Sequence, residues 1–190
     1  MKTKLFSLLI VLLALSLSVS VFAAPFDPET FVYVGGAGGP QTLDPASSYD
    51  TASGEVIHQI YDNLFEYVDG ELDNIGPMLA TEVPTVANGL MSEDGRTIRV
   101  PIRQGVKFHS GATLTAEDVR YSFLRGMLAD PAGGPMWMFF EPLLGVQTMR
   151  SVIEMAGGSG DFAAIDEVDP TILRKAYDLV AATIEVDGND

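Results

Sequence analysis

Apolar side chains recur at helical spacing soon after residue 50, and this pattern predicts the first helix of the chain. Ser53 is a favourable N-cap for a helix from Gly54 to about Tyr67. Apolar positions fall on one face of this stretch and polar positions on the other, as in a helix that covers a core. The apolar face consists of Val56, Ile57, Ile60, Tyr61, Leu64 and Phe65.

Two later helices are predicted by signals at their first turns. Thr115 and Asp118 have the spacing of a capping box, and Asp130-Pro131 ends the apolar stripe that follows. Asp169 followed by Pro170 has the order of an N-cap and a first helical residue, and apolar positions then recur at helical spacing to Val180.

Strands are predicted in four shorter stretches. Residues 31–35 form a buried apolar run, and residues 97–103 form a strand in which Pro101 requires an edge or a bulge. Residues 106–108 are extended before a turn, and residues 182–186 form a strand before the hairpin signal Asp187-Gly188. Because the chain stops two residues after this turn, we expect it to be an N-terminal piece of a longer protein. Helices and strands mix without strict alternation, which favours an α/β or α+β architecture.

The N-terminus has the pattern of an export signal over residues 1–23. Lys2 and Lys4 precede a long apolar stretch, and a small residue at Ala23 favours cleavage there. A membrane anchor is the alternative, but the Ser-rich second half favours cleavage, after which we expect no stable membrane insertion. The chain has no Cys, which excludes a lipid-anchored Cys and disulfides, so we expect a free protein in the periplasm.

The formal net charge is −15, and it becomes −17 when the two lysines leave with the signal. An acidic chain of this kind repels phosphate backbones, so we expect no nucleic-acid partner.

Motifs for catalysis or cofactors are incomplete in this chain. His58 and His109 lack a second ligand at helical spacing, which argues against zinc. The glycines at 35–39 match neither nucleotide-binding fingerprint, and residues 157–161 lack the closing glycine of a nucleophile elbow. We therefore expect no cofactor, no metal and no catalytic residue.

Several blocks resemble the extracellular solute-binding proteins of family 5, the receptors of ABC importers for peptides and nickel. The blocks stand in the family's order along about 100 residues of the chain. They are Leu43-Asp44-Pro45, residues 60–64 (IYDNL), residues 77–80 (PMLA) and residues 103–111 (RQGVKFHSG), the last continuing into residues 114–119 (LTAEDV).

This resemblance implies a two-lobed periplasmic binding protein of the class II-like type, of which the chain holds the first lobe in part. Residues 24–45 would begin lobe I, residues 46–160 would form its extra subdomain, and residues 161–190 would return to lobe I. The resemblance also implies ligand contacts from Tyr49, Asp50 and Thr51 after the Leu-Asp-Pro block, and from Met136 and Trp137 after the capped helix. The alternative for residues 136–140 is an ordinary core segment, since apolar runs are usually buried.

The function implied is a monomeric, non-enzymatic receptor that binds peptides and delivers them to the permease subunits of an ABC importer. Oligosaccharides or a nickel chelate are alternative ligands within the same family. Alternatives from other classes are a secreted hydrolase with its catalytic residues beyond residue 190, and a structural or chaperone-like periplasmic domain.

Overall fold

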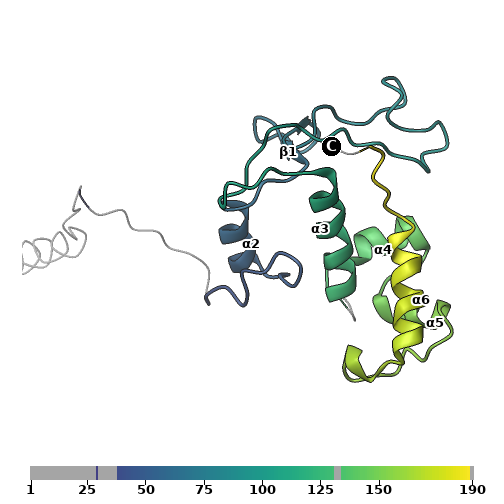
Figure 1. The fold of residues 1–190 in the computed structure, drawn as a ribbon. Coiled ribbons are helices and arrows are strands. Elements are labelled where there is room, and N and C mark those ends of the chain that lie inside the picture. Colours follow the sequence, from purple (N-terminus) through teal and green to yellow (C-terminus); the bar gives the residue numbers. More distant parts are fainter. Residues whose placement is uncertain (1–28, 30–37, 131–133, 189–190) are drawn as a thin grey trace, which may run out of the picture. The chain divides into compact units, whose positions relative to one another are not determined.

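The structure is a computed structural model that describes residue 29, residues 38–130 and residues 134–188 (Figure 1). The chain divides into two units, residues 1–36 and residues 37–190, and the helices and strands named below belong to the second unit. The expected export signal over residues 1–23 and the expected strand over residues 31–35 lie outside the described residues.

The second unit is mainly helical, with one small antiparallel sheet. Helix α2 (Thr51–His58) comes first, followed by strands β1 (Phe65–Tyr67) and β2 (Ile75–Pro77), which pair with Glu66 opposite Gly76. The helices that follow are α3 (Ala116–Ala129), α4 (Trp137–Leu144), α5 (Met149–Met155) and α6 (Pro170–Ala181), with the short 3₁₀ helix η2 (Ile165–Glu167) before α6. A mixture of helices with a small sheet fits part of a periplasmic binding protein fold.

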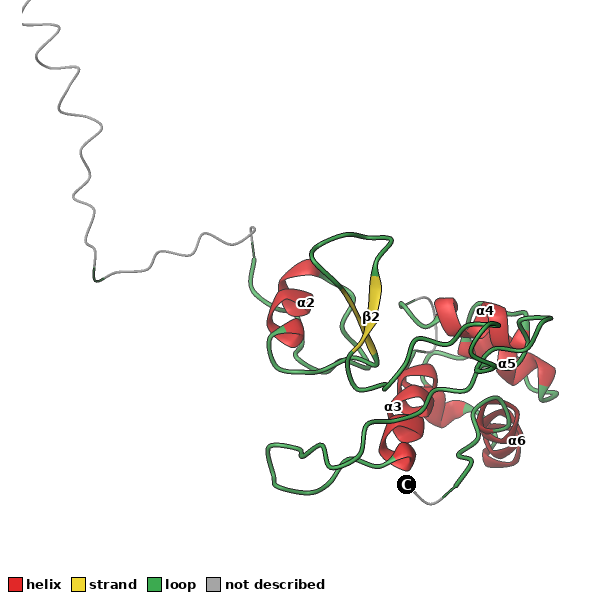
Figure 2. Cartoon of the chain, turned by 90° about the horizontal axis from the view of Figure 1, so that it is seen from above, coloured by secondary structure: helices red, strands yellow, loops and turns green. Residues whose placement is uncertain are grey.

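The hydrophobic core lies among α3, α4, α5 and α6, which Figure 2 shows grouped together. Helix α3 stands between α2 and the helices α4 to α6 in both views (Figures 1 and 2). The ring of Phe123 on α3 meets that of Phe139 on α4 edge to face, with centroids 5.0 Å apart. The buried side chains of this core are Leu124, Met127, Phe140, Met149, Val152, Ile153, Phe162, Val168, Ala176 and Val180.

The two capping predictions for α3 and α6 are confirmed. The Thr115 hydroxyl accepts from the Asp118 backbone N–H, and the Asp118 carboxylate accepts from the Thr115 N–H at 2.8 Å, which completes the box. Helix α3 then ends at Ala129, before Asp130 and Pro131 as expected. Asp169 caps α6 through the Thr171 N–H at 2.7 Å, and Pro170 is the first helical residue.

The predicted helix from Gly54 to Tyr67 is wrong at both ends. Helix α2 begins three residues earlier, at Thr51, because Asp50 provides the cap, and the helix ends at His58. The last part of the predicted stripe, Phe65–Tyr67, is strand β1. Asp69 and Gly70 both have positive φ in the turn that follows, so the chain folds back and β2 becomes available for pairing.

Three predicted strands are not strands in the described part of the chain, and of these residues 106–108 contribute only the isolated bridge Lys107↔Thr113. Residues 97–103 make only the isolated bridges Met91↔Ile98 and Ala80↔Ile102, and Pro101 supplies a carbonyl to the Thr81 N–H at 2.9 Å. Residues 182–186 follow α6 as a turn and a loop. Instead of a neighbouring strand, the Arg120 guanidinium of α3 donates to the Ile184 carbonyl at 2.8 Å.

An ion pair connects α3 to the segment that precedes α2. The Arg125 guanidinium donates to both Asp44 carboxylate oxygens, each at 2.6 Å, across 81 residues of sequence. The Ala46 N–H donates to the same carboxylate at 3.0 Å. The hydrogen bond from Arg125 is the main reason why the pKa of Asp44 is lowered to about 2. The pair therefore fixes the Leu-Asp-Pro block against the helix.

Thr115→Ala should lower the free energy of unfolding by about 1 kcal/mol, because it removes the hydroxyl that satisfies an N–H in the first turn of α3. Urea unfolding followed by circular dichroism measures this change. Thr115→Ser is the matched control, since serine keeps a hydroxyl that can accept from the same N–H. An equal loss in both variants would contradict the capping role of the Thr115 hydroxyl.

The Asp44–Arg125 pair predicts a specific acid titration. Because the folded pKa of Asp44 lies below its ordinary value of 3.8, the pair stabilises the fold fully above that pH and is lost as the pH falls towards about 2. Carboxyl ¹³C NMR of Asp44 should show this low midpoint, and Arg125→Met should move the midpoint back towards 3.8. An unchanged midpoint in the variant would show that Arg125 does not hold the carboxylate.

Candidate functional site

The segment from Gln41 to Asp50 is an internally bonded loop centred on one buried hydroxyl. Ser53, in the first turn of α2, is fully buried, and its Oγ accepts from the Gln41 and Thr42 N–H groups at 3.0 and 3.2 Å. The same Oγ donates to Asp50 Oδ2 at 2.6 Å, and the Ser53 N–H donates to Asp50 Oδ1 at 2.9 Å. The loop is thus closed at its base by a network of hydrogen bonds around this one side chain.

The three residues predicted to follow the Leu-Asp-Pro block as ligand contacts have different positions in this loop. Asp50 uses both carboxylate oxygens on Ser53, and the hydrogen bond from the Ser53 hydroxyl is the main cause of its lowered pKa. Thr51 is the exposed first residue of α2. Tyr49 is 66% exposed, so its side chain is the one with a large free surface.

The second predicted contact segment lies at the start of α4. The Asp130 carboxylate accepts from the Gly134 N–H at 2.7 Å and from the Met136 N–H at 3.0 Å, which fixes the backbone entering this helix. Met136 is half-buried against the core, whereas Trp137 is 43% exposed. Phe140 is fully buried, so the run over residues 136–140 provides core at one end and an accessible aromatic face at the other.

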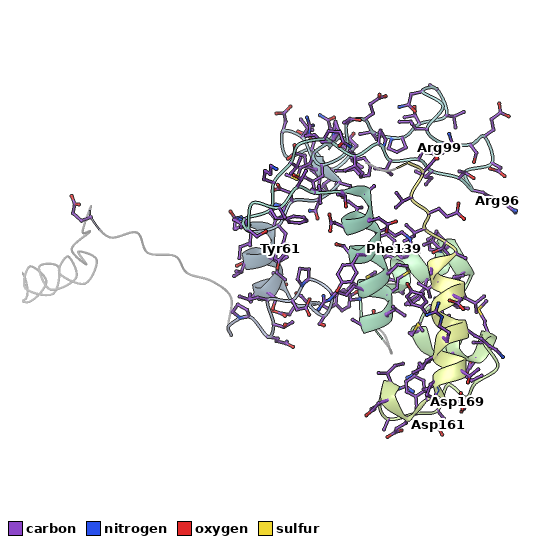
Figure 3. The ribbon with its side chains drawn as sticks, viewed as in Figure 1. Tyr61, Arg96, Arg99, Phe139, Asp161 and Asp169 are labelled. Carbon is purple, nitrogen blue, oxygen red and sulfur yellow. The ribbon has the colours of Figure 1, made fainter. Side chains whose placement is uncertain are left out.

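Helix α3 contacts both segments at neighbouring positions. Arg125 binds the loop through Asp44, and Gly126 lies beside the end of the Met136 side chain, where an added Cβ atom would be 2.8 Å from Met136 Cε. Consecutive residues of an α-helix point about 100° apart, so the two segments approach adjacent faces of the same turn. Figure 3 shows Phe139, which follows these residues, beside α3. Helix α3 therefore contacts both predicted segments, although they are far apart in sequence.

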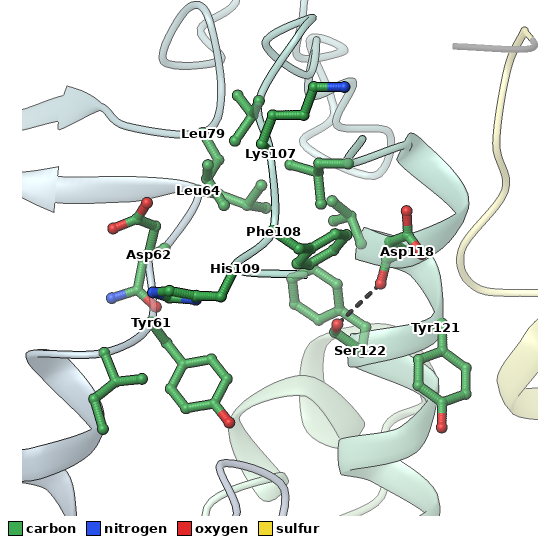
Figure 4. Close-up of a pocket in the computed structure, with 16 residues that line it drawn as sticks. Tyr61, Asp62, Leu64, Leu79, Lys107, Phe108, His109, Asp118, Tyr121 and Ser122 are labelled. Carbon is green, nitrogen blue, oxygen red and sulfur yellow. Dashed lines mark hydrogen bonds between the residues drawn. The ribbon is translucent and has the colours of Figure 1, made fainter. Parts of the chain in front are cut away.

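A separate cavity of about 630 Å³ lies beside the first turns of the same helix. Its walls come from the segment that follows α2, from the segment at residues 106–109 and from α3 (Figure 4). The apolar lining consists of Ile60, Leu64, Leu79, Val106, Phe108, Leu114, Val119 and Phe123. None of the five predicted contact residues lines it. The sequence signal that could have found this cavity is the apolar pair Val106 and Phe108, which precedes the apolar stripe of α3.

The polar groups around this cavity are mostly committed to structure. The Asp118 carboxylate belongs to the capping box, the Ser122 hydroxyl donates to the Asp118 carbonyl at 2.9 Å, and Lys107 donates to Thr113. Figure 4 shows Asp62 and His109 near Tyr61, and all three are exposed. The arrangement can enclose an apolar group, but its described residues hold no nucleophile beside a base.

Metal ligands do not gather in the described part of the chain: within it, no three His, Cys, Asp or Glu side chains are close enough together to hold a metal ion. No helix in the same residues has the length and apolar character needed to cross a membrane.

Comparison with known proteins identifies several relatives. The chain is 27% identical over 140 residues to a periplasmic murein peptide-binding protein of Escherichia coli K12, covering 73% of this chain and 24% of that protein. It is 31% identical over 120 residues to a probable D,D-dipeptide-binding periplasmic protein of the same strain, covering 63% and 22% of the two chains. It is 34% identical over 85 residues to an oligopeptide-binding protein of Bacillus subtilis 168, covering 44% and 14%.

The chain thus spans about a quarter or less of the length of these relatives. No solved structure shows significant similarity to it. The sequence model of the bacterial extracellular solute-binding proteins, family 5 middle, matches residues 74–176, which is more than half of the chain. This match includes the block at residues 103–111 and helix α3, and it shows that the chain belongs to the bacterial extracellular solute-binding proteins of family 5.

Proposed function

We propose that this chain is part of a receptor that binds peptides for an ABC importer. The observation that carries the proposal is the set of ligands in the names of its relatives. These names specify a murein peptide, a D,D-dipeptide and an oligopeptide, which share a peptide backbone and differ in side chains and size. A site for this class must bind a common backbone and tolerate varied side chains.

The proposed place of action is the periplasm. Two of the relatives are named as periplasmic proteins, and the export pattern over residues 1–23 would bring this chain to the same compartment. From there the receptor would pass its peptide to membrane permease subunits. Because the energy of import would come from separate ATPase subunits, the receptor itself needs no nucleotide site.

Tyr49 and Trp137 are the residues that we assign to the peptide. Both are aromatic and substantially exposed, and each belongs to a segment that α3 contacts. Aromatic faces contact varied side chains through a large area, and Met136 behind Trp137 adds an adaptable thioether. Asp50 and Thr51 would act through the backbone of the loop, since the Asp50 carboxylate is occupied by Ser53.

The proposed mechanism is enclosure of the peptide between two lobes that close around a hinge. In this scheme residues 24–45 and 161–190 belong to lobe I, and residues 46–160 form its extra subdomain. Closure would exclude water from the peptide and create the form that the permease recognises. The receptor would release its solute unchanged, in agreement with a family of binding proteins rather than enzymes.

Titration calorimetry of the exported full-length chain tests the ligand class. Trialanine and pentaalanine should bind with saturation, whereas maltotriose and a nickel–histidine complex should give no binding heat. Saturable binding of the sugar or of the nickel complex alone would contradict the peptide assignment. Mass spectrometry of the recovered peptide checks the enzyme alternative, because a cleaved peptide would show that the protein is a hydrolase and not a receptor.

Trp137 provides a direct optical test, since it is the only tryptophan in the chain. Addition of pentaalanine should change its fluorescence, because the indole is 43% exposed in the free chain. Trp137→Ala should weaken pentaalanine binding roughly tenfold, the effect of losing about 1.4 kcal/mol of contact energy.

Leu72→Ala is the matched control for Trp137→Ala. Leu72 is an apolar side chain that is 80% exposed in the turn between β1 and β2, and it belongs to neither contact segment. Its removal should leave peptide affinity unchanged. Equal affinities of the Trp137 variant and the unaltered chain would remove Trp137 from the proposed site.

A further inference from the structure

Three Asp-Gly pairs occur in this chain, and two of them lie well inside the described residues: Asp69-Gly70 and Asp94-Gly95. In such a pair the glycine nitrogen can attack the preceding side-chain carboxyl, because no side chain on the glycine hinders its approach. Both aspartates are exposed and both glycines have positive φ, so sequence and exposure do not distinguish the two pairs. The two pairs differ in the hydrogen bonds that their carboxylates and glycine N–H groups make.

At Asp69-Gly70 both reacting groups are free of hydrogen bonds to other described residues. The turn is closed by the Glu71 N–H, which donates to the Val68 carbonyl at 3.1 Å and leaves Asp69 and Gly70 at its centre. Asp69 has φ of 58°, the only positive value for a non-glycine residue in the described part of the chain. A left-handed conformation is less favourable for a residue with a Cβ than for glycine.

At Asp94-Gly95 both reacting groups are engaged. The Asp94 carboxylate accepts from the Ser92 hydroxyl at 2.7 Å and from the Arg96 N–H at 3.1 Å. The Gly95 N–H donates to the Ser92 carbonyl at 2.9 Å, so the proton that the reaction must remove from this nitrogen is held in a hydrogen bond. The bond from the Ser92 hydroxyl also lowers the pKa of Asp94, which reduces the protonated form that must lose water.

We propose that Asp69-Gly70 is a site of spontaneous isoaspartate formation, and that the hydrogen bonds of Asp94-Gly95 protect that pair from the same reaction. The Gly70 nitrogen forms a bond to Asp69 Cγ, and the carboxyl hydroxyl leaves with the amide proton as water. Water then opens the succinimide ring. Attack at the main-chain carbonyl leaves the glycine attached through Cγ, as isoaspartate, and attack at Cγ restores aspartate. No oxidation or reduction is involved.

The modification would alter the β1–β2 turn. Isoaspartate places the Cβ methylene of residue 69 in the main chain, which lengthens the connection between Val68 and Glu71 by one atom. The Val68 N–H donates to the Asn74 carbonyl at 2.8 Å immediately outside this turn, and the strands continue the ladder from there. The change thus occurs at the point that sets the register of a sheet with strands of three residues each.

The test is to age the purified full-length chain at mildly acidic pH and then to digest it with a protease that cleaves on the C-terminal side of glutamate. This digestion separates residues 67–71 from residues 94–117, and isoaspartyl methyltransferase labelling with electron-transfer fragmentation measures isoaspartate in each peptide. Isoaspartate should accumulate severalfold faster at residue 69 than at residue 94. In concentrated urea the two rates should converge, because the hydrogen bonds that distinguish the pairs are lost.

Two variants make the comparison sharper. Ser92→Ala should raise the rate of isoaspartate formation at residue 94 severalfold and leave the rate at residue 69 unchanged. Asp69→Glu should abolish isomerisation at residue 69, because the longer glutamate side chain would have to close a larger ring than the succinimide. Equal rates at the two pairs in buffer, or a faster rate at residue 94, would overturn the proposal. No effect of Ser92→Ala would overturn the protection assigned to that hydroxyl.

Discussion

The placement of the loop before α2 against α3 depends on the two-oxygen contact of Arg125 with Asp44. This contact joins a loop before α2 to the middle of α3, and it does so with the planar fork geometry that makes guanidinium–carboxylate pairs specific. The next residue of α3, Gly126, lies against the end of the Met136 side chain, and the Asp130 carboxylate after α3 fixes the backbone that enters α4. One turn of one helix therefore contacts two segments, those of Tyr49 and Trp137, that belong to distant parts of the sequence.

Local signals predicted the parts of this fold that are decided locally. The spacing of Thr115 and Asp118, and the order of Asp169 and Pro170, each describe hydrogen bonds within a single helical turn, and both helices begin where expected. The apolar stripe from Val56 to Phe65 predicted a helix that was too long at its C-terminal end, because residues at the end of the stripe form a strand of a hairpin instead. Pairing of Phe65 with Pro77 depends on the turn at Asp69-Gly70, which lies outside the stripe. Residues 182–186 have the composition of a strand, but no neighbouring strand lies among the described residues.

The candidate site could be predicted only in outline. Resemblance to the family pointed to the segments around Tyr49 and Trp137. The pairing of Asp44 with Arg125 spans 81 residues, and a contact between residues so far apart produces no periodic pattern in a single sequence. The cavity beside Phe108 was missed for a similar reason, since its walls come from three separated segments. Most of the described polar groups near both places hydrogen-bond to backbone groups or cap helices.

Hydrogen exchange of the free protein tests most directly whether α3 holds the loop before any solute arrives. The Thr42, Ala46 and Ser48 amides donate respectively to Ser53 Oγ, Asp44 Oδ1 and the Asp44 carbonyl, so we predict that all three are protected in the absence of peptide. We also predict that Arg125→Met removes this protection while the core amides of α5 and α6 keep theirs. Full protection of the loop amides in Arg125→Met, or their exchange at the rate of an unfolded chain in the unaltered protein, would contradict the role of α3 as the anchor of the loop.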